Sequence, residues 1–143
     1  MAGSYQIFIS HSSIDTWVAE QLAAHVARAG ATSFLDAAHI EHGDDFDEVI
    51  LAAAQASSEM LVLLTPWSKD RPYVWMEIGM FRLSRKRVVA VLHGLTSSDI
   101  ATDERIPVVL KKIDLVGLND VASYFAQLQR RANGEGDHVR QDV

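Results

Sequence analysis

The sequence of 143 residues contains no cysteine, which excludes disulfides, thiolate metal sites and a cysteine nucleophile. It also lacks any apolar run of membrane-spanning length and any basic and apolar leader at its start. Its length suits one domain with a real core. We therefore expect a soluble, cytoplasmic, single-domain protein.

Positive charge is scarce as well. The 13 Lys and Arg residues face 19 Asp and Glu residues, and the formal net charge is -6. Basic residues cluster at 82–87 and 130–131, and the first cluster falls at the end of a predicted helix, where positive charge is stabilising. Phosphate contacts need clustered Lys and Arg, so we expect neither a nucleic-acid nor a membrane partner.

Several catalytic motifs are absent. There is no G-x-G-x-x-G and no G-x-x-x-x-G-K-[ST], which argues against an ordinary dehydrogenase or a P-loop nucleotidase. There is no G-x-S-x-G elbow, which argues against a nucleophilic triad although Ser10 and His11 are adjacent. A phosphoaspartate receiver needs acidic residues after the first and third strands, where this chain has Ser10-His11 and Thr65.

The periodicity of apolar residues predicts strands alternating with helices. Expected strands cover 5–10, 32–36, 60–65, 87–92 and a segment within 108–116, and expected helices cover 14–30, 45 onward, 72–86 and 119–131. The polar stretch at 95–104 is expected to be irregular or to form a short helix. Gly30 is expected to stop the first helix, and Asp45 and Glu48 have capping-box spacing at the second. Residues 132–143 are expected to form a polar, frayed tail after a domain at 1–131.

This alternation predicts a flavodoxin-like three-layer sandwich, in which helices flank a five-stranded parallel sheet. Functional residues should then gather on the loops that follow the strands. These loops cover 10–13, 36–43, 65–72 and 93–95.

Glu77 is the leading catalytic candidate. A very apolar segment ends at Leu64, a polar elbow follows, and Pro72 begins a helix that carries Glu77. Open α/β sheets bind ligands beyond the carboxyl ends of their strands, which is where this carboxylate is expected. With Tyr73 and Trp75 nearby, it suits a nucleotide or sugar pocket. The alternative is a solvated glutamate favoured by the helix dipole.

Two other loops carry candidate binding residues. Ser10, His11, Ser12 and Ser13 can offer hydroxyl and N–H groups to an anion, or Ser12, Ser13 or Asp15 can cap the following helix. Asp36 can bond ribose hydroxyls or form a turn. The loop residues His39, Glu41, His42 and Asp44 make a poor metal site, and we expect no metal.

Three segments in register resemble the Toll/interleukin-1 receptor (TIR) domain family in its bacterial form. They are Ile7 to Asp15; Phe34-Leu35-Asp36 with Ile40, Gly43 and Phe46; and Thr65-Pro66 through Tyr73-Val74-x-x-Glu77. The resemblance covers about residues 4–131. Departures from the family pattern are Thr65 and Arg71 in place of serines, Tyr73 in place of tryptophan, and an added Trp67.

The resemblance implies NAD+ cleavage, with NAD+ as substrate and no cofactor. It gives Glu77 the catalytic role, lets Tyr73 and Trp75 pack on a base or ring, and places Ser10 to Ser13, Asp36 and Glu41 around the substrate. A fixed carboxylate can stabilise the oxocarbenium-like ribose that forms when the nicotinamide–ribose bond breaks. Expected products are ADP-ribose, a cyclic isomer or a conjugate, sensed by a downstream effector as in antiphage defence of the Thoeris type.

The resemblance also implies self-association between TIR domains, through the loop 37–45 with Gly43 as its pivot. Two other functions remain open. The chain could be a noncatalytic homotypic scaffold, or a sensor that binds a nucleotide without turnover. The fold alone does not establish activity, so the choice rests on the site residues. Among them, Glu77 favours the enzyme.

Overall fold

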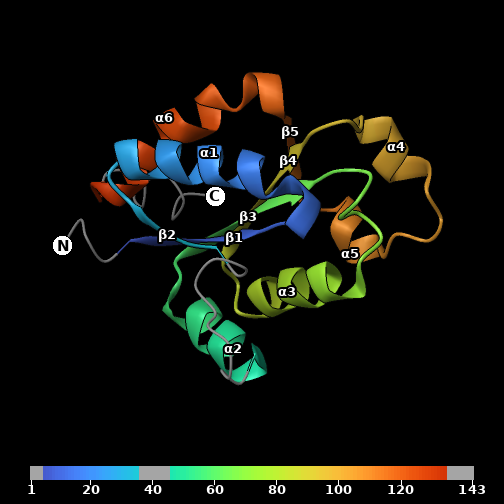
Figure 1. Cartoon of the computed structure of the whole chain (residues 1–143), viewed down its shortest axis with the longest axis horizontal. Helices are drawn as coiled ribbons and strands as arrows, with labels where there is room; N and C mark the ends of the chain where they lie inside the picture. Colours follow the sequence, from blue (N-terminus) through green and yellow to red (C-terminus); the bar gives the residue numbers. More distant parts are fainter. Residues whose placement is uncertain (1–4, 36–45, 135–143) are drawn as a thin grey trace.

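A five-stranded parallel sheet forms the centre of the molecule, with strand order β2-β1-β3-β4-β5 (Figure 1). The computed structural model describes residues 5–35 and 46–134. The elements are β1 (Gln6–Ser10), η2 (Ser13–Asp15), α1 (Thr16–Arg28), β2 (Thr32–Leu35), α2 (Phe46–Ala56), β3 (Glu59–Leu64), α3 (Pro72–Leu83), β4 (Arg87–Leu92), α4 (Ser97–Thr102), α5 (Val108–Lys111), β5 (Asp114–Gly117), η3 (Leu118–Asp120) and α6 (Ala122–Ala132). The predicted flavodoxin-like sandwich is confirmed.

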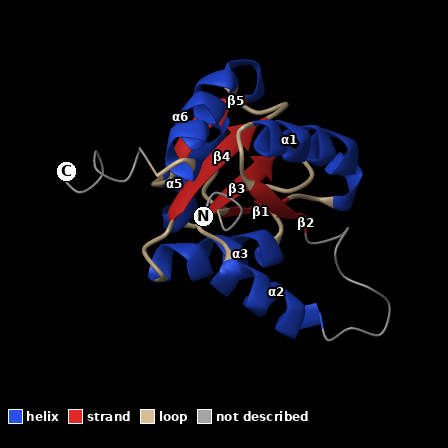
Figure 2. Cartoon of the chain, turned by 90° about the vertical axis from the view of Figure 1, so that its left-hand side faces the viewer, coloured by secondary structure: helices blue, strands red, loops and turns tan. Residues whose placement is uncertain are grey.

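Helices cover both faces of the sheet. α1 and α6 lie on one face, and α2 and α3 lie on the other (Figures 1 and 2). β3 is buried along its whole length, which explains why its sequence is a continuous apolar run rather than an alternating one. Successive side chains alternate between two cores: Met60, Val62 and Leu64 point to the α2 and α3 side, while Leu61 and Leu63 point to the α1 and α6 side.

The strand order places a topological switch between β1 and β3. From β1 the chain first adds β2 on one side and then crosses back to add β3 on the other, with Ile9 opposite Leu35 and Leu61. The loops that leave the carboxyl ends of β1 and β3 therefore diverge to opposite faces. Open α/β sheets bind ligands in the crevice that such a divergence creates.

Two predicted helix boundaries are confirmed and one is wrong. Gly30, with φ of 93°, follows α1, and Pro72 opens α3. The helix expected at 72–86 ends at Leu83 instead. Arg85 has φ of 59°, and the N–H groups of Arg85 and Lys86 donate to the carbonyls of Arg82 and Phe81. This closing motif normally uses glycine, so an arginine there gave no stop signal.

The segment near the fifth strand is partly as expected. The strand expected within 108–116 is confirmed as β5, which pairs with β4 from Asp114 to Gly117, but the start of the segment forms a short helix, α5, that was not expected. Pro107 precedes this helix, and proline favours a first helical turn. The short helix that was one of the two expectations for 95–104 is confirmed as α4, which is fixed by a capping box between Thr96 and Asp99. Asp45 of the other expected capping box lies outside the described residues.

Candidate active site

A buried carboxylate and a buried hydroxyl meet at the switch point. Ser10 is the last residue of β1, and its Oγ donates a hydrogen bond of 2.6 Å to Oε1 of Glu77 on α3. Both side chains are fully buried. A carboxylate without exposure is costly unless it is bonded, so the contact with Ser10 is part of what stabilises Glu77 there.

The position of Glu77 on its helix explains its burial. The buried residues of α3 are Val74, Glu77, Ile78 and Phe81, which have the i, i+3, i+4, i+7 spacing of a core-facing stripe. Three of these four positions are apolar, and the fourth is a carboxylate. Pro72 begins the helix two residues before this stripe.

The first loop contributes buried polar groups around that contact. His11 and Ser12 are buried, whereas Ser13 is exposed. Ser12 Oγ accepts a hydrogen bond of 3.1 Å from the N–H of Ile14 and so caps η2. Of the loop's two proposed roles, capping therefore accounts for Ser12, and the hydroxyl of Ser10 faces Glu77.

The elbow after β3 is tied to this first loop by a second buried contact. Thr65 Oγ1 donates a hydrogen bond of 2.6 Å to Oδ2 of Asp15, and Asp15 makes no side-chain cap at α1. The same Thr65 oxygen accepts from the N–H of Trp67 at 3.2 Å. Ser68 Oγ accepts from the N–H of Thr65 and donates to the carbonyl of Leu63. The elbow therefore has one fixed shape over the ends of β1 and β3.

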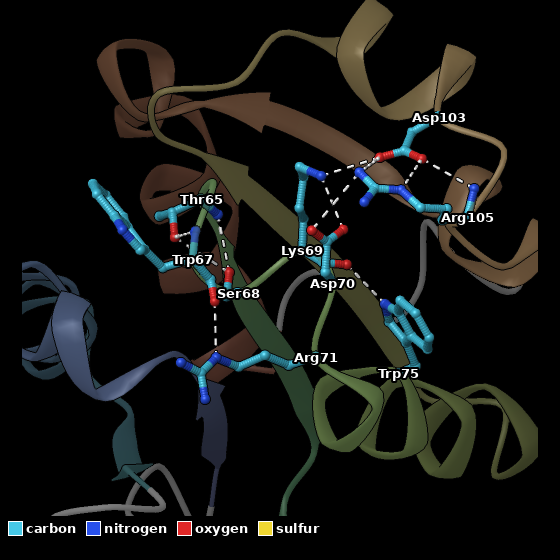
Figure 3. A network of polar contacts seen from close by, with 9 residues as sticks. All are labelled: Thr65, Trp67, Ser68, Lys69, Asp70, Arg71, Trp75, Asp103 and Arg105. Carbon is cyan, nitrogen blue, oxygen red and sulfur yellow. Dashed lines mark hydrogen bonds and ion pairs between the residues drawn. The ribbon is translucent and has the colours of Figure 1, made fainter.

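On its other side the elbow is held by a charged cluster (Figure 3). Lys69 Nζ lies 2.9 Å from Asp70 and 3.0 Å from Asp103, which follows α4. Arg105 also binds Asp103 at 3.1 Å. Hydrogen bonds from Arg105, and then from Lys69, hold the pKa of the Asp103 carboxyl well below its usual range. Asp103 is therefore a fixed anion that anchors the elbow to α4.

The two predicted aromatic residues lie at different places on α3. Tyr73 is one turn before Glu77, is partly buried, and its hydroxyl donates to Asp47 at 3.2 Å. Trp75 Nε1 donates to the carbonyl of Lys69 at 2.8 Å, so its indole packs beside the charged cluster (Figure 3). Their contacts with substrate stay predictions. Asp36 and Glu41 lie outside the described residues.

A second buried glutamate marks the opposite end of the sheet. Glu59 begins β3 and accepts hydrogen bonds from the hydroxyls of Tyr5 and Tyr124. Arg131 of α6 adds two more, at 2.9 and 3.0 Å. Burial, and then the neighbouring carboxylate, raise the pKa of Tyr5 to about 12. Bonded at both oxygens by three residues, one before β1 and two on α6, Glu59 is a structural anchor.

No metal site competes with this location in the described part of the chain. Residues 5–35 and 46–134 contain no group of three or more potential ligands among His, Asp and Glu. A surface cleft of about 360 Å³ lies between α2 and α3, with Leu51, Met80 and Lys86 in its lining. Lys86 there binds the carbonyls that end α2, and the cleft includes no predicted site residue.

Sequence reasoning missed the contact between Asp15 and Thr65. It treated Asp15 as a possible helix cap and Thr65 as a substituted serine. The two residues are 50 positions apart, and they meet only because β1 and β3 are neighbours in the sheet. The sequence does contain a signal for this contact. Polar residues directly follow two strands, and a sheet order of 2-1-3-4-5 makes those two strands neighbours.

These features define an α/β domain of the flavodoxin-like class with a buried carboxylate at its topological switch point. The chain belongs to the TIR domain family, whose sequence model matches residues 7–130. Among the described residues, no helix has the length and apolar character needed to cross a membrane.

Known proteins similar to this chain include an enzyme and two receptors. A probable 2′ cyclic ADP-D-ribose synthase of Brachypodium distachyon, BdTIR, is 29% identical over 104 residues, which cover 71% of this chain and 46% of the relative. The chain thus spans about half of that protein's length. The TIR domain of the Toll-related receptor TRR-2 of Hydra magnipapillata has a TM-score of 0.64 at 19% identity, covering 90% of this chain and 98% of that one. A metazoan TIR-STING receptor of C. gigas has a TM-score of 0.68 at 20% identity, covering 90% and 40%.

Proposed function

We propose that this chain cleaves the nicotinamide–ribose bond of NAD+, with Glu77 as the catalytic carboxylate. The observation that carries the proposal is the fully buried Glu77, held by Ser10 at 2.6 Å beside the switch point of the sheet. Support also comes from the relative named as a cyclic ADP-ribose synthase, although it is matched over only part of its length.

The chemistry needs no metal and no oxidant. When the bond between ribose C1′ and the nicotinamide nitrogen breaks, its electron pair leaves with the nicotinamide, which becomes neutral. Positive charge then develops on the ribose, where a fixed carboxylate stabilises it more than water would. Attack by water, with loss of a proton, gives ADP-ribose. Attack by a nucleophile of the same ADP-ribosyl group, also with loss of a proton, gives a cyclic isomer.

Access to Glu77 determines when such a reaction can occur. Because Glu77 is fully buried, NAD+ can reach it only after some covering segment moves. An enzyme of this kind is silent until a trigger changes its conformation. We infer that self-association of TIR domains is that trigger, and that the product is a nucleotide signal for an effector in bacterial antiphage defence.

A product assay tests the proposal directly. Concentrated protein is incubated with NAD+, and nicotinamide and ADP-ribosyl products are identified by mass spectrometry. Glu77→Gln keeps the shape of the side chain and removes its charge, so we expect turnover to fall on the order of a hundredfold or more. Glu20→Gln, the same change at an exposed position of α1, should leave turnover unchanged.

The outcomes separate the enzyme from the alternatives. Circular dichroism must show that Glu77→Gln is folded. Wild-type turnover in a folded Glu77→Gln variant contradicts the assignment. If the wild-type chain self-associates at high concentration but releases no nicotinamide, the noncatalytic scaffold becomes the better reading.

A further inference from the structure

The elbow between β3 and α3 presents two different sides (Figure 3). Lys69, Asp103 and Arg105 form the charged cluster on one side. The indole of Trp67 and the guanidinium of Arg71 lie on the other, toward the start of α1. Arg71 Nε donates a hydrogen bond of 2.8 Å to the carbonyl of Trp67, which fixes the direction of the guanidinium. Among the described residues, the indole N–H of Trp67 and the two terminal nitrogens of Arg71 make no hydrogen bond or ion pair.

The two cations of the elbow differ in how their charge is compensated. Lys69 lies within 3.0 Å of two carboxylates, those of Asp70 and Asp103. Arg71 is exposed and makes no ion pair with any carboxylate in the described part of the chain. Since only its Nε is bonded to the elbow, its two terminal nitrogens are available for a planar, bidentate partner.

The position of this pair relative to Glu77 follows from a chain of contacts. The N–H of Trp67 donates to Thr65 Oγ1, and Thr65 Oγ1 donates to Asp15 in the loop that continues from Ser10. Arg71 is also the residue directly before α3, the helix that carries Glu77. Trp67 and Arg71 therefore belong to the elbow at the carboxyl edge of the sheet, the same edge near which Ser10 and Glu77 meet.

An anionic ligand needs such a cation here. The protein has a net charge of -6, and its site contains the carboxylates of Glu77 and Asp15. Both disfavour the approach of a diphosphate, which only a local positive charge can offset. The indole of Trp67 is 51% exposed, a large apolar face left open to solvent. An aromatic face and a guanidinium on one rigid loop are the two groups that bind a nucleotide's base and its phosphates.

We propose that the elbow is the nucleotide-recognition element of this site, in which Arg71 binds the diphosphate of the dinucleotide and Trp67 stacks on its adenine base. The proposal rests on the proposed function for its choice of dinucleotide. It adds a division of labour: Glu77 acts at the ribose that loses nicotinamide, and the elbow holds the other half of the molecule.

Direct binding tests this without any turnover. Isothermal titration measures the affinity of ADP and of adenosine, which share the base but differ in the diphosphate. Arg71→Gln should weaken ADP about tenfold to a hundredfold, because it removes a charge-assisted contact, and should leave adenosine unchanged. Trp67→Ala should weaken both ligands. Arg71→Lys should recover only part of the ADP affinity, because it keeps the charge but loses the fork.

Arg82→Gln is the matched control. Arg82 is an exposed arginine in the last turn of α3, so the change in net charge is the same but falls at the far end of the helix. If Arg71→Gln and Arg82→Gln bind ADP equally well, Arg71 has no specific role and the proposal is wrong. Absence of ADP binding by the wild-type chain at millimolar concentration also overturns it.

The two proposals can fail separately. Binding of ADP that depends on Arg71, in a protein that releases no nicotinamide from NAD+, leaves the elbow as a nucleotide site and refutes the reaction. Turnover of NAD+ with the same KM in wild type and Arg71→Gln supports the reaction and refutes the elbow. Loss of adenosine binding in Arg71→Gln contradicts the division of roles.

Discussion

Thr65→Val removes the link between the elbow and the first loop while keeping the β-branched shape of the side chain. The lost hydroxyl donates 2.6 Å to the buried carboxylate of Asp15 and accepts from the N–H of Trp67. A hydrogen bond to a charged group contributes about 1.5–3 kcal/mol, and leaving the buried partner unsatisfied places the cost in the upper part of that range. We expect the free energy of unfolding to fall by about 2–3 kcal/mol.

That cost converts into a measurable melting shift. Unfolding entropy of about 2.1 cal/mol/K per residue amounts to about 0.3 kcal/mol/K for a chain of 143 residues. Thr65→Val should therefore melt about 7–10 °C below wild type, as followed by circular dichroism, with an unchanged urea m-value.

Thr65→Ser is the control for this experiment, because it keeps the hydroxyl and loses only a methyl group. It should melt clearly above Thr65→Val. A double-mutant cycle with Asp15→Ala should give a coupling energy above about 1 kcal/mol. Equal melting temperatures for the Val and Ser variants, or additive effects in the cycle, would refute the reasoning.

Three further predictions concern stability, metals and assembly. The pKa of Tyr5 in the folded state is raised to about 12 from 10.0, so its contribution to the free energy of unfolding is full below pH 10 and is lost as the pH rises from about 10 to about 12; urea titrations should show this slope, and Tyr5→Phe should reduce it to the part that comes from Tyr124, whose pKa is also raised by burial. Chelators should leave NAD+ turnover unchanged, and recovery of EDTA-treated enzyme by zinc or magnesium would contradict this. Specific activity should rise with protein concentration and Gly43→Pro should abolish that rise, whereas constant activity in a chain that light scattering shows to be monomeric would exclude a shared site.

The strands and the catalytic candidate were predictable because their signals are local. The apolar run before Thr65 and the proline at 72 predict a strand, an elbow and a helix. The phase of Glu77 within that helix was also available, since Val74, Ile78 and Phe81 mark the core-facing stripe. A carboxylate within an apolar stripe is a stronger signal of a candidate functional residue than the distance of that residue from the strand.

The contacts of the site could not be predicted in the same way. Ser10 and Glu77 are 67 positions apart, and which hydroxyl of the first loop meets the carboxylate depends on the height at which α3 packs on the sheet. The ties between Lys69 and Asp103 depend on where α4 ends. Such contacts follow from tertiary packing, which periodicity does not describe. The four-residue helix α5 was missed because its apolar residues read equally well as a strand.

The Glu59 anchor has a practical consequence for building fusions of this domain. It binds Tyr5 at the start of β1 and Arg131 at the end of α6, so both ends of the folded domain leave from the amino edge of the sheet (Figure 1). Ser10 and Glu77 meet near the carboxyl edge. A fluorescent reporter, an affinity tag or an inducible dimerising module can therefore be attached at either end without covering the crevice. Pairing two copies through such a module tests whether their proximity alone activates the domain or whether a particular contact geometry is needed.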